Sequence, residues 1–171
     1  MTTRNVKESI ESAISFLHDN PQKARYTDTA ATASIEDTLR CHAVAPDGTG
    51  IRSDMPPGVG GGGEAPSPGW LMRAALANCD ATLIAMRAAQ LGIALSELEV
   101  VVDSESDDRG LLAMDHSVPA GPLSMRTRIR IRSDGSSEEE LRELIEWAER
   151  HSPVADAIRR AVPMRTEVEI K

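Results

Sequence analysis

The stretch GGGGEAPSPGWLMRAALANCDATLIAMRAAQLG occupies residues 60–92 and decides the fold of this chain. It opens with four glycines, which accept backbone conformations closed to other residues and predict a mobile loop. Ser67 and Pro68 then form a helix start signal, because serine caps a first turn and proline fits the first helical position. No helix breaker follows until Gly92, a favoured residue just past a helix end. The stretch therefore predicts one long, largely apolar helix over residues 71–91.

The composition indicates a single globular protein with an aliphatic core. The chain has 171 residues, of which 40% are hydrophobic, 27% charged and only 2% aromatic. A net charge of −8 argues against nucleic acid as a partner. No apolar run is long enough to span a membrane, and residues 1–5 lack the apolar segment of a secretory signal. We therefore expect a cytoplasmic protein with no membrane partner, whose Cys41 and Cys79 are free thiols.

Alternating patterns outside the long helix predict strands. Residues 29–44 and 51–54 read as a hairpin, and residues 97–105, 123–132 and 165–171 as three further strands. The strand at 123–132 alternates apolar residues with arginine, whereas the other two of these strands carry glutamate and aspartate. Because opposite charges attract across neighbouring strands, we expect the arginine strand to lie between the two acidic ones.

Three shorter helices complete the expected α+β fold. Residues 6–17 carry apolar side chains at helical spacing and predict an amphipathic N-terminal helix. A capping box from Ser137 to Glu140 predicts a second helix, and Ser152 followed by Pro153 predicts a third. The four histidines show no metal-ligand spacing, and the glycine run lacks the continuation of a phosphate-binding loop. We therefore expect no metal ion and no cofactor.

Cys79 is the candidate for chemistry, and two interpretations of it stay open. It is either a small core side chain or a thiolate nucleophile toward an electrophile such as a peroxide. The second interpretation needs a cation, which must come from outside the helix. Arg40 and Cys41 are neighbours on a predicted strand, so they point to opposite faces and only one can face the helix. Ser152 reads as a helix cap or as a neighbour of Cys79, and Glu64 as a solvated loop charge.

Two segments carry a resemblance to a known family: GEAPSPGWLMRAALANC at residues 63–79, continuing through residues 85–100, and HSPV at residues 151–154. Their order and spacing resemble the OsmC/Ohr family, the osmotically inducible and organic hydroperoxide resistance proteins. The resemblance covers roughly residues 26–171 and leaves 1–25 as an N-terminal helical extension. It implies an α+β fold in which antiparallel sheets pack on long central helices. It also implies an intertwined homodimer with the reactive cysteine at the interface.

The resemblance also implies an activity. Active members reduce organic hydroperoxides through a peroxidatic cysteine, which an arginine activates and a second cysteine resolves; a glutamate holds the arginine, and an external dithiol regenerates the enzyme. Cys79 matches the peroxidatic residue. Arg40 is the first candidate for the activating arginine and Arg25 the second. The resolving position is Ser152 and the glutamate position is Gly69, so this chain departs from the family pattern at both.

Two functions follow from this comparison. The first is an OsmC-like thiol peroxidase that reduces organic hydroperoxides through Cys79 in oxidative stress defence. Its sulfenic acid would be resolved by Cys41 or by an external thiol. The second is a non-catalytic OsmC-like dimer that binds an apolar small molecule or senses oxidants. The departures at Ser152 and Gly69 favour the second function.

Overall fold

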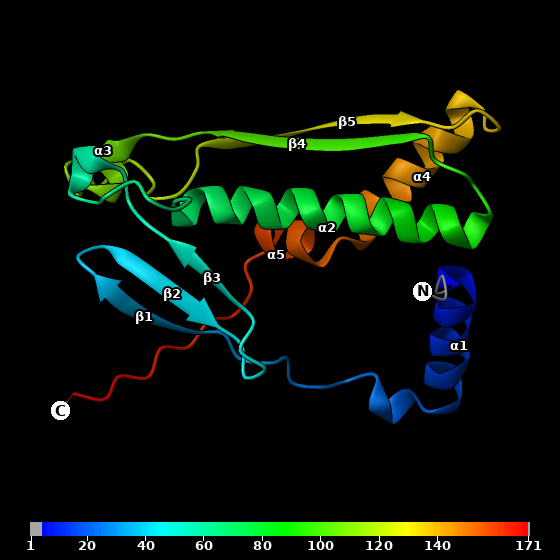
Figure 1. The fold of residues 1–171 in the computed structure, drawn as a ribbon, viewed down its shortest axis with the longest axis horizontal. Helices are drawn as coiled ribbons and strands as arrows, with labels where there is room; N and C mark the ends of the chain where they lie inside the picture. Colours follow the sequence, from blue (N-terminus) through cyan, green and yellow to red (C-terminus); the bar gives the residue numbers. More distant parts are fainter. Residues whose placement is uncertain (1–4, 171) are drawn as a thin grey trace. The chain divides into compact units, whose positions relative to one another are not determined.

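The structure is a computed structural model that describes residues 5–170 (Figure 1). Its elements are α1 (Val6–Asp19), β1 (Thr32–Asp37), β2 (Arg40–Val44), β3 (Gly50–Ser53), α2 (Pro68–Leu91), β4 (Glu97–Glu105), α3 (Asp108–Leu111), β5 (Ser124–Arg132), α4 (Glu138–His151) and α5 (Pro153–Arg159). Short 3-10 turns lie at Pro21–Lys23 and Pro57–Val59. The expected α+β class with antiparallel sheets is confirmed, as is the long helix after the glycine run.

The chain divides into two compact units, which we describe separately. The first contains residues 1–75 and 102–126, and the second contains residues 76–101 and 127–171. The first turns of α2 therefore belong to one unit and the rest of the helix, with Cys79, to the other.

The first unit holds an antiparallel sheet in the order β1-β2-β3. A tight turn after β1, with Thr38 at a φ of 47°, splits the predicted strand at residues 29–44 into β1 and β2. Across the sheet Cys41 stands opposite Ile35 on one side and Ser53 on the other. The register thus fixes which side chains share a face of this sheet.

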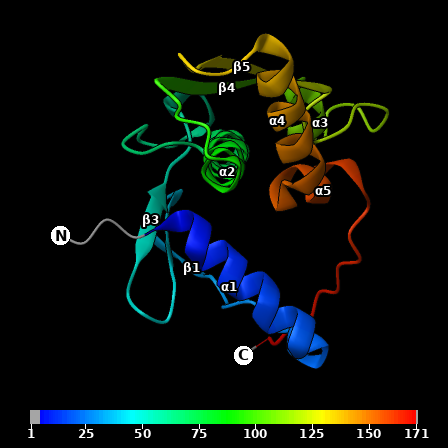
Figure 2. The same ribbon diagram turned by 90° about the vertical axis from the view of Figure 1, so that its right-hand side faces the viewer.

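The core of the second unit lies between α2, α4 and the strands above them. Ile84 and Ala88 of α2 pack against Leu144 and Ala148 of α4, and all four side chains are buried. Figure 2 looks along α2 and shows α4 beside it, with β4 and β5 covering both helices. The partly buried side chains around this core are Leu83, Ile93, Leu95, Leu98, Val100, Ile129, Ile131, Leu141, Ile145 and Trp147. As expected from the composition, the core is almost entirely aliphatic.

The β4–β5 pair confirms half of the predicted strand order. The two strands are hydrogen-bonded neighbours, and Arg126 pairs with Asp103 at 3.1 Å and Arg130 with Glu99 at 2.5 Å. The prediction of a second acidic strand was wrong, because residues 165–170 form no strand and Ile170 is 91% exposed. A strand is stable only when another strand pairs with it, and none in the described part of the chain pairs with this segment.

The helices follow their sequence signals closely. α4 begins with the predicted capping box between Ser137 and Glu140, and Ser152 caps α5 by accepting a hydrogen bond from the amide of Ala155. The predicted N-terminal helix is confirmed as α1, which buries none of its residues. Among residues 5–170 no helix combines the length and the hydrophobicity that a bilayer crossing needs. The cytoplasmic location stays a prediction.

Candidate functional site

Cys79 and Ser152 meet inside the second unit. Cys79 lies half-buried on α2, and the Ser152 hydroxyl donates a hydrogen bond to its sulfur at an Oγ–Sγ distance of 3.3 Å. Ser152 is only 1% exposed, and its Oγ also accepts from the amide of Ala155 at 3.3 Å. The start of α5 therefore fixes the hydroxyl that touches the thiol. Both cysteines of the chain are free, as expected.

Asp80, the residue after Cys79, is a buried acid inside the apolar stripe of α2. It is 4% exposed and lies on the same helix face as Leu76, Ile84 and Ala88. Its Oδ1 atom has no hydrogen-bond partner among the described residues. The charged residues of α2, Arg73, Asp80 and Arg87, stand seven apart, and the structure buries the middle one. A buried polar atom without a partner costs stability.

Arg40 lies in the first unit at the start of β2, within a charged cluster. Its guanidinium Nη1 donates to the carboxylate of Glu64, and its Nε lies 3.7 Å from Glu36. Arg52 of β3 donates two hydrogen bonds to Glu36, at 2.9 and 3.0 Å, and holds the pKa of Glu36 below its ordinary value. His42 lies 3.5 Å from Glu36. Glu64, expected to be a solvated loop charge, is thus the close partner of Arg40.

Cys41 lies on the other face of the same sheet. The residues directly opposite it are Ile35 and Ser53, whereas Arg40 shares its face with the charged cluster. Its sulfur has one weak contact, with the carbonyl oxygen of Leu39 at 4.0 Å. The alternation predicted from the sequence is confirmed, so an arrangement that turns Arg40 toward a site turns Cys41 away from it.

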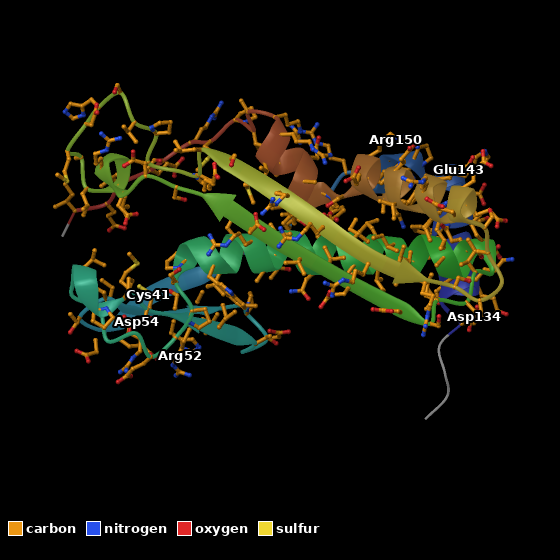
Figure 3. The ribbon with its side chains drawn as sticks, turned by 90° about the horizontal axis from the view of Figure 1, so that it is seen from above. Cys41, Arg52, Asp54, Asp134, Glu143 and Arg150 are labelled. Carbon is orange, nitrogen blue, oxygen red and sulfur yellow. The ribbon has the colours of Figure 1, made fainter. Side chains whose placement is uncertain are left out.

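Hydrogen bonds to Asp54 hold the loop that contains the glycine run, while the predicted mobility of the run stays a prediction. Asp54, which follows β3, receives hydrogen bonds from the amides of Met55, Gly62 and Glu64 at 2.8, 3.1 and 3.1 Å. Figure 3 labels Asp54, which follows Arg52 of β3 by two residues. The hydrogen bond from the Glu64 amide contributes most to lowering the pKa of Asp54. The buried carboxylate of Asp54 thus ties together three amides of the loop.

Gly69 lies in the first turn of α2 and lines a cavity of about 520 Å³ within the first unit. The cavity wall is mostly apolar, with Met55, Met72 and Leu111 among its residues. A Cβ atom at Gly69 would meet nothing closer than the Arg73 guanidinium, at 3.9 Å. The position has room for a side chain. Arg25, the second candidate for an activating arginine, lies in the exposed segment before β1.

A second cavity of about 550 Å³ lies within the second unit, between the end of α2 and the outer side of α4. Figure 3 shows Glu143 and Arg150 of α4, which line it. Its aromatic wall is Trp147, whose ring lies 4.8 Å from the Arg87 guanidinium and stacks on His151. The Arg87 contact joins α2 to α4 through a cation over an indole ring, whereas the stack of Trp147 on His151 lies within α4.

Comparison with known proteins decides the family. The profile of the OsmC-like protein family matches residues 61–167, which contain Cys79, Ser152 and Gly69. The chain belongs to the OsmC-like family. No curated protein matches the sequence closely enough to add a named relative.

Solved structures of OsmC and Ohr proteins share the fold. An OsmC-like protein from Mycoplasma pneumoniae superposes with a TM-score of 0.67 at 17% identity, covering 80% of this chain and 91% of that one. An organic hydroperoxide resistance protein from Legionella pneumophila gives 0.57 at 22%, covering 79% and 91%. Bacillus subtilis OhrB gives 0.51 at 20%, covering 79% and 93%. At these identities the likeness establishes the fold alone.

The structure joins one of the predicted pairs and adds two residues. It brings Ser152 to Cys79, as one interpretation of Ser152 required. It adds Glu64 and Asp54, which the sequence did not single out as partners of Arg40 and of the loop. The sequence signal for Asp54 was its position at the start of a loop rich in proline and glycine, where a short acceptor side chain can reach nearby amides.

Proposed function

We propose that this chain is a thiol-dependent peroxidase that reduces organic hydroperoxides through Cys79 as its single reactive cysteine. Membership of the OsmC-like family supports a hydroperoxide-related function. The observation that carries the proposal is the contact between the Cys79 sulfur and the buried hydroxyl of Ser152. This hydrogen bond supports reactivity of the half-buried thiol, because a donor to the sulfur favours its thiolate form.

The first chemical step forms a sulfenic acid on Cys79. The thiolate sulfur attacks the terminal oxygen of the hydroperoxide, the O–O bond breaks, and an S–O bond forms. The alkoxide that leaves takes up a proton and departs as an alcohol. We retain Arg40 as the cation for this step. Its pairing with Glu64 supports the assignment, because an arginine held by a carboxylate is pre-oriented for work on a second anion.

The second step needs an external dithiol. Ser152 stands at the resolving position and has no sulfur, so it cannot form a disulfide with Cys79. One thiol of the dithiol condenses with the sulfenic acid, releases water and leaves a mixed disulfide. The other thiol then closes the reductant's own disulfide and frees Cys79. Cys41 fits this step less well, because it lies on the opposite strand face from Arg40.

The homodimer implied by the family resemblance belongs to the same proposal. It is supported by exposed apolar side chains on the β1-β2-β3 sheet, Ile35 and Ile51, and in the segment at residues 165–170, Val168 and Ile170. Apolar side chains in such numbers favour a covering partner. Sedimentation across a concentration series measures this directly, and a strictly monomeric protein would contradict it.

The test of the proposed activity combines turnover with chemical trapping. Purified protein is incubated with cumene hydroperoxide and dithiothreitol, and the consumption of hydroperoxide is followed. In parallel, dimedone captures the sulfenic acid for mass analysis. Wild type and Cys41→Ser should turn over and label at Cys79, while Cys79→Ser should do neither. Full turnover by Cys79→Ser would remove Cys79 as the nucleophile.

One alternative has a specific observation in its favour. With Ser152 in place of a resolving cysteine, an oxidised Cys79 would persist, as in a redox sensor or a protein that binds an apolar molecule without turnover. Labelling of Cys79 by dimedone without catalytic turnover would favour the sensor. If Cys79 shows neither labelling nor turnover, the remaining function is that of a protein that binds an apolar molecule.

A further inference from the structure

The inference concerns Asp54 and the loop that it closes in the first unit. Asp54 is 3% exposed, and its carboxylate receives the amides of Met55, Gly62 and Glu64. Its own amide donates to the carbonyl oxygen of Pro66 at 3.2 Å. Backbone and side chain of one residue therefore close the loop between residues 54 and 66.

Glu64 is the residue that connects this loop to Arg40. Its amide is held by Asp54 at 3.1 Å, and its carboxylate receives the Nη1 donor of Arg40. The Glu64 side chain is itself largely exposed. A glutamate on a free loop would sample many backbone conformations, and most of them would carry its carboxylate away from Arg40. Fixing the Glu64 backbone removes much of that freedom.

The alternative partner of Arg40 is already occupied. Glu36 receives two hydrogen bonds from Arg52, and it lies 3.7 Å from the Arg40 Nε. Glu64 is therefore the carboxylate on which the direction of the Arg40 guanidinium depends most. At Gly69, where the resemblance implied the arginine-holding glutamate, this chain has no carboxylate.

The loop conformation leaves little choice of sequence. A Cβ at Gly61 would lie 1.9 Å from the Met55 carbonyl oxygen, and Gly63 has a φ of 68°. Gly61 therefore has no space for a side chain, and the left-handed backbone at Gly63 favours glycine. The glycine run is best explained as a tight path that brings the Glu64 amide back to Asp54.

We propose that Asp54 is a positioning residue for Arg40, and that it acts through the amide and the carboxylate of Glu64. Any effect on turnover rests on the proposed function, since it requires that Arg40 take part in peroxide reduction. The placement of Arg40 itself does not require this. The two can therefore be tested separately.

The intact, folded protein is labelled with phenylglyoxal. Peptide mass analysis after digestion then gives the labelling rate of each arginine. Asp54→Asn removes one anionic acceptor, and Glu64→Gln removes the ion pair. Asp47→Asn is the matched control, because Asp47 also accepts an amide in a turn, that of Thr49 at 2.9 Å. We expect Arg40 to label about fivefold faster in Asp54→Asn and in Glu64→Gln, and at the wild-type rate in the control.

Two further variants make the test specific. In the double variant Asp54→Asn with Glu64→Gln, labelling should be no faster than in Glu64→Gln alone, because both changes release one contact. Gly62→Ala disturbs the same carboxylate from the loop side, since its Cβ would lie 3.0 Å from Asp54 Oδ2, and should give a smaller acceleration. It replaces Asp54→Asn if that variant does not fold.

Wild-type labelling of Arg40 in both Asp54→Asn and Gly62→Ala would overturn the proposal, as would multiplicative effects in the double variant. Turnover provides the second readout. Asp54→Asn and Glu64→Gln should lower kcat/KM for cumene hydroperoxide by the same factor, and Asp47→Asn should not. If neither the wild type nor any variant shows turnover, the proposed function fails. The labelling result still decides whether Asp54 positions Arg40.

Discussion

Replacing Ser152 by cysteine should convert the chemistry at Cys79 from a persistent sulfenic acid to a disulfide. The perturbation is made in a Cys41→Ser background, so that only one intramolecular disulfide can form. The Ser152 Oγ lies 3.3 Å from the Cys79 Sγ. A disulfide needs sulfurs about 2 Å apart, which a small rotation of either side chain supplies.

The structure also sets the size of the effect on stability. The bond would join residues 73 apart, and constraining a loop of this length in the unfolded chain stabilises the fold by roughly 4 kcal/mol. The reduced variant should be less stable than wild type. It loses the Ser152 cap on Ala155, worth about 1 kcal/mol, and places a larger atom in a buried site, at a similar cost.

The assay adds one equivalent of cumene hydroperoxide and compares intact masses and unfolding in urea, with and without reductant. The double variant should lose about 2 Da on oxidation, whereas the Cys41→Ser parent should gain about 16 Da. Oxidation should raise its unfolding free energy, and reduction should reverse the gain. A stable sulfenic acid in the double variant, with no disulfide, would refute the placement of Ser152 beside Cys79.

Four other predictions follow from single positions, each checked by urea unfolding against wild type. Gly69→Glu should stabilise the fold by about 1 kcal/mol, because the site has room and an acid favours the first turn of a helix. Asp80→Ala should stabilise by about 1 kcal/mol by removing a buried oxygen without a partner, and a loss of stability would mean that Asp80 has one. Leu144→Ala should destabilise by about 3 kcal/mol, since Leu144 is buried in the core of the second unit. Hydrogen bonds from Arg109 lower the pKa of Asp107 to about 2. Asp107→Asn should therefore be less stable than wild type above about pH 4, and this difference in unfolding free energy should vanish as the pH falls to about 2. A difference that stays unchanged over that range would contradict the pairing.

The sequence predicted the elements whose signals are local. The helix start at Ser67 and Pro68, the capping box at Ser137 and the cap at Ser152 all depend on residues three or four apart, and all are confirmed. The arginine strand also found one acidic neighbour in β4, because alternation and charge are visible along a single strand. In the helix signals the interacting groups are close in the chain, whereas the strand pairing was predicted from the alternation and the charge of each whole strand.

The misses involve partners far apart in the chain or outside it. Glu64 and Arg40 are 24 residues apart, and no periodicity links a loop to a strand. Asp54 accepts hydrogen bonds from Gly62 and Glu64, eight and ten residues further along the chain, and the glycine run alone gave no sign of this contact. Asp80 is buried although it belongs to the evenly spaced charged residues of α2. Helical projection did not predict this burial, because it gives the direction of a side chain and not the element that covers it. The segment at residues 165–170 has a strand pattern, yet a pattern cannot provide the neighbour that a strand needs.

The two faces of β2 have a consequence for how such a protein could change over evolutionary time. Arg40 and Cys41 point to opposite faces because the side-chain period of a strand is two residues. A single-residue insertion or deletion in the turn at Thr38 that slid β2 by one place would exchange them, without any substitution in the strand. One indel would thus place a thiol where a guanidinium now faces the Glu36 carboxylate, so the length of this turn decides which side chain joins the charged cluster.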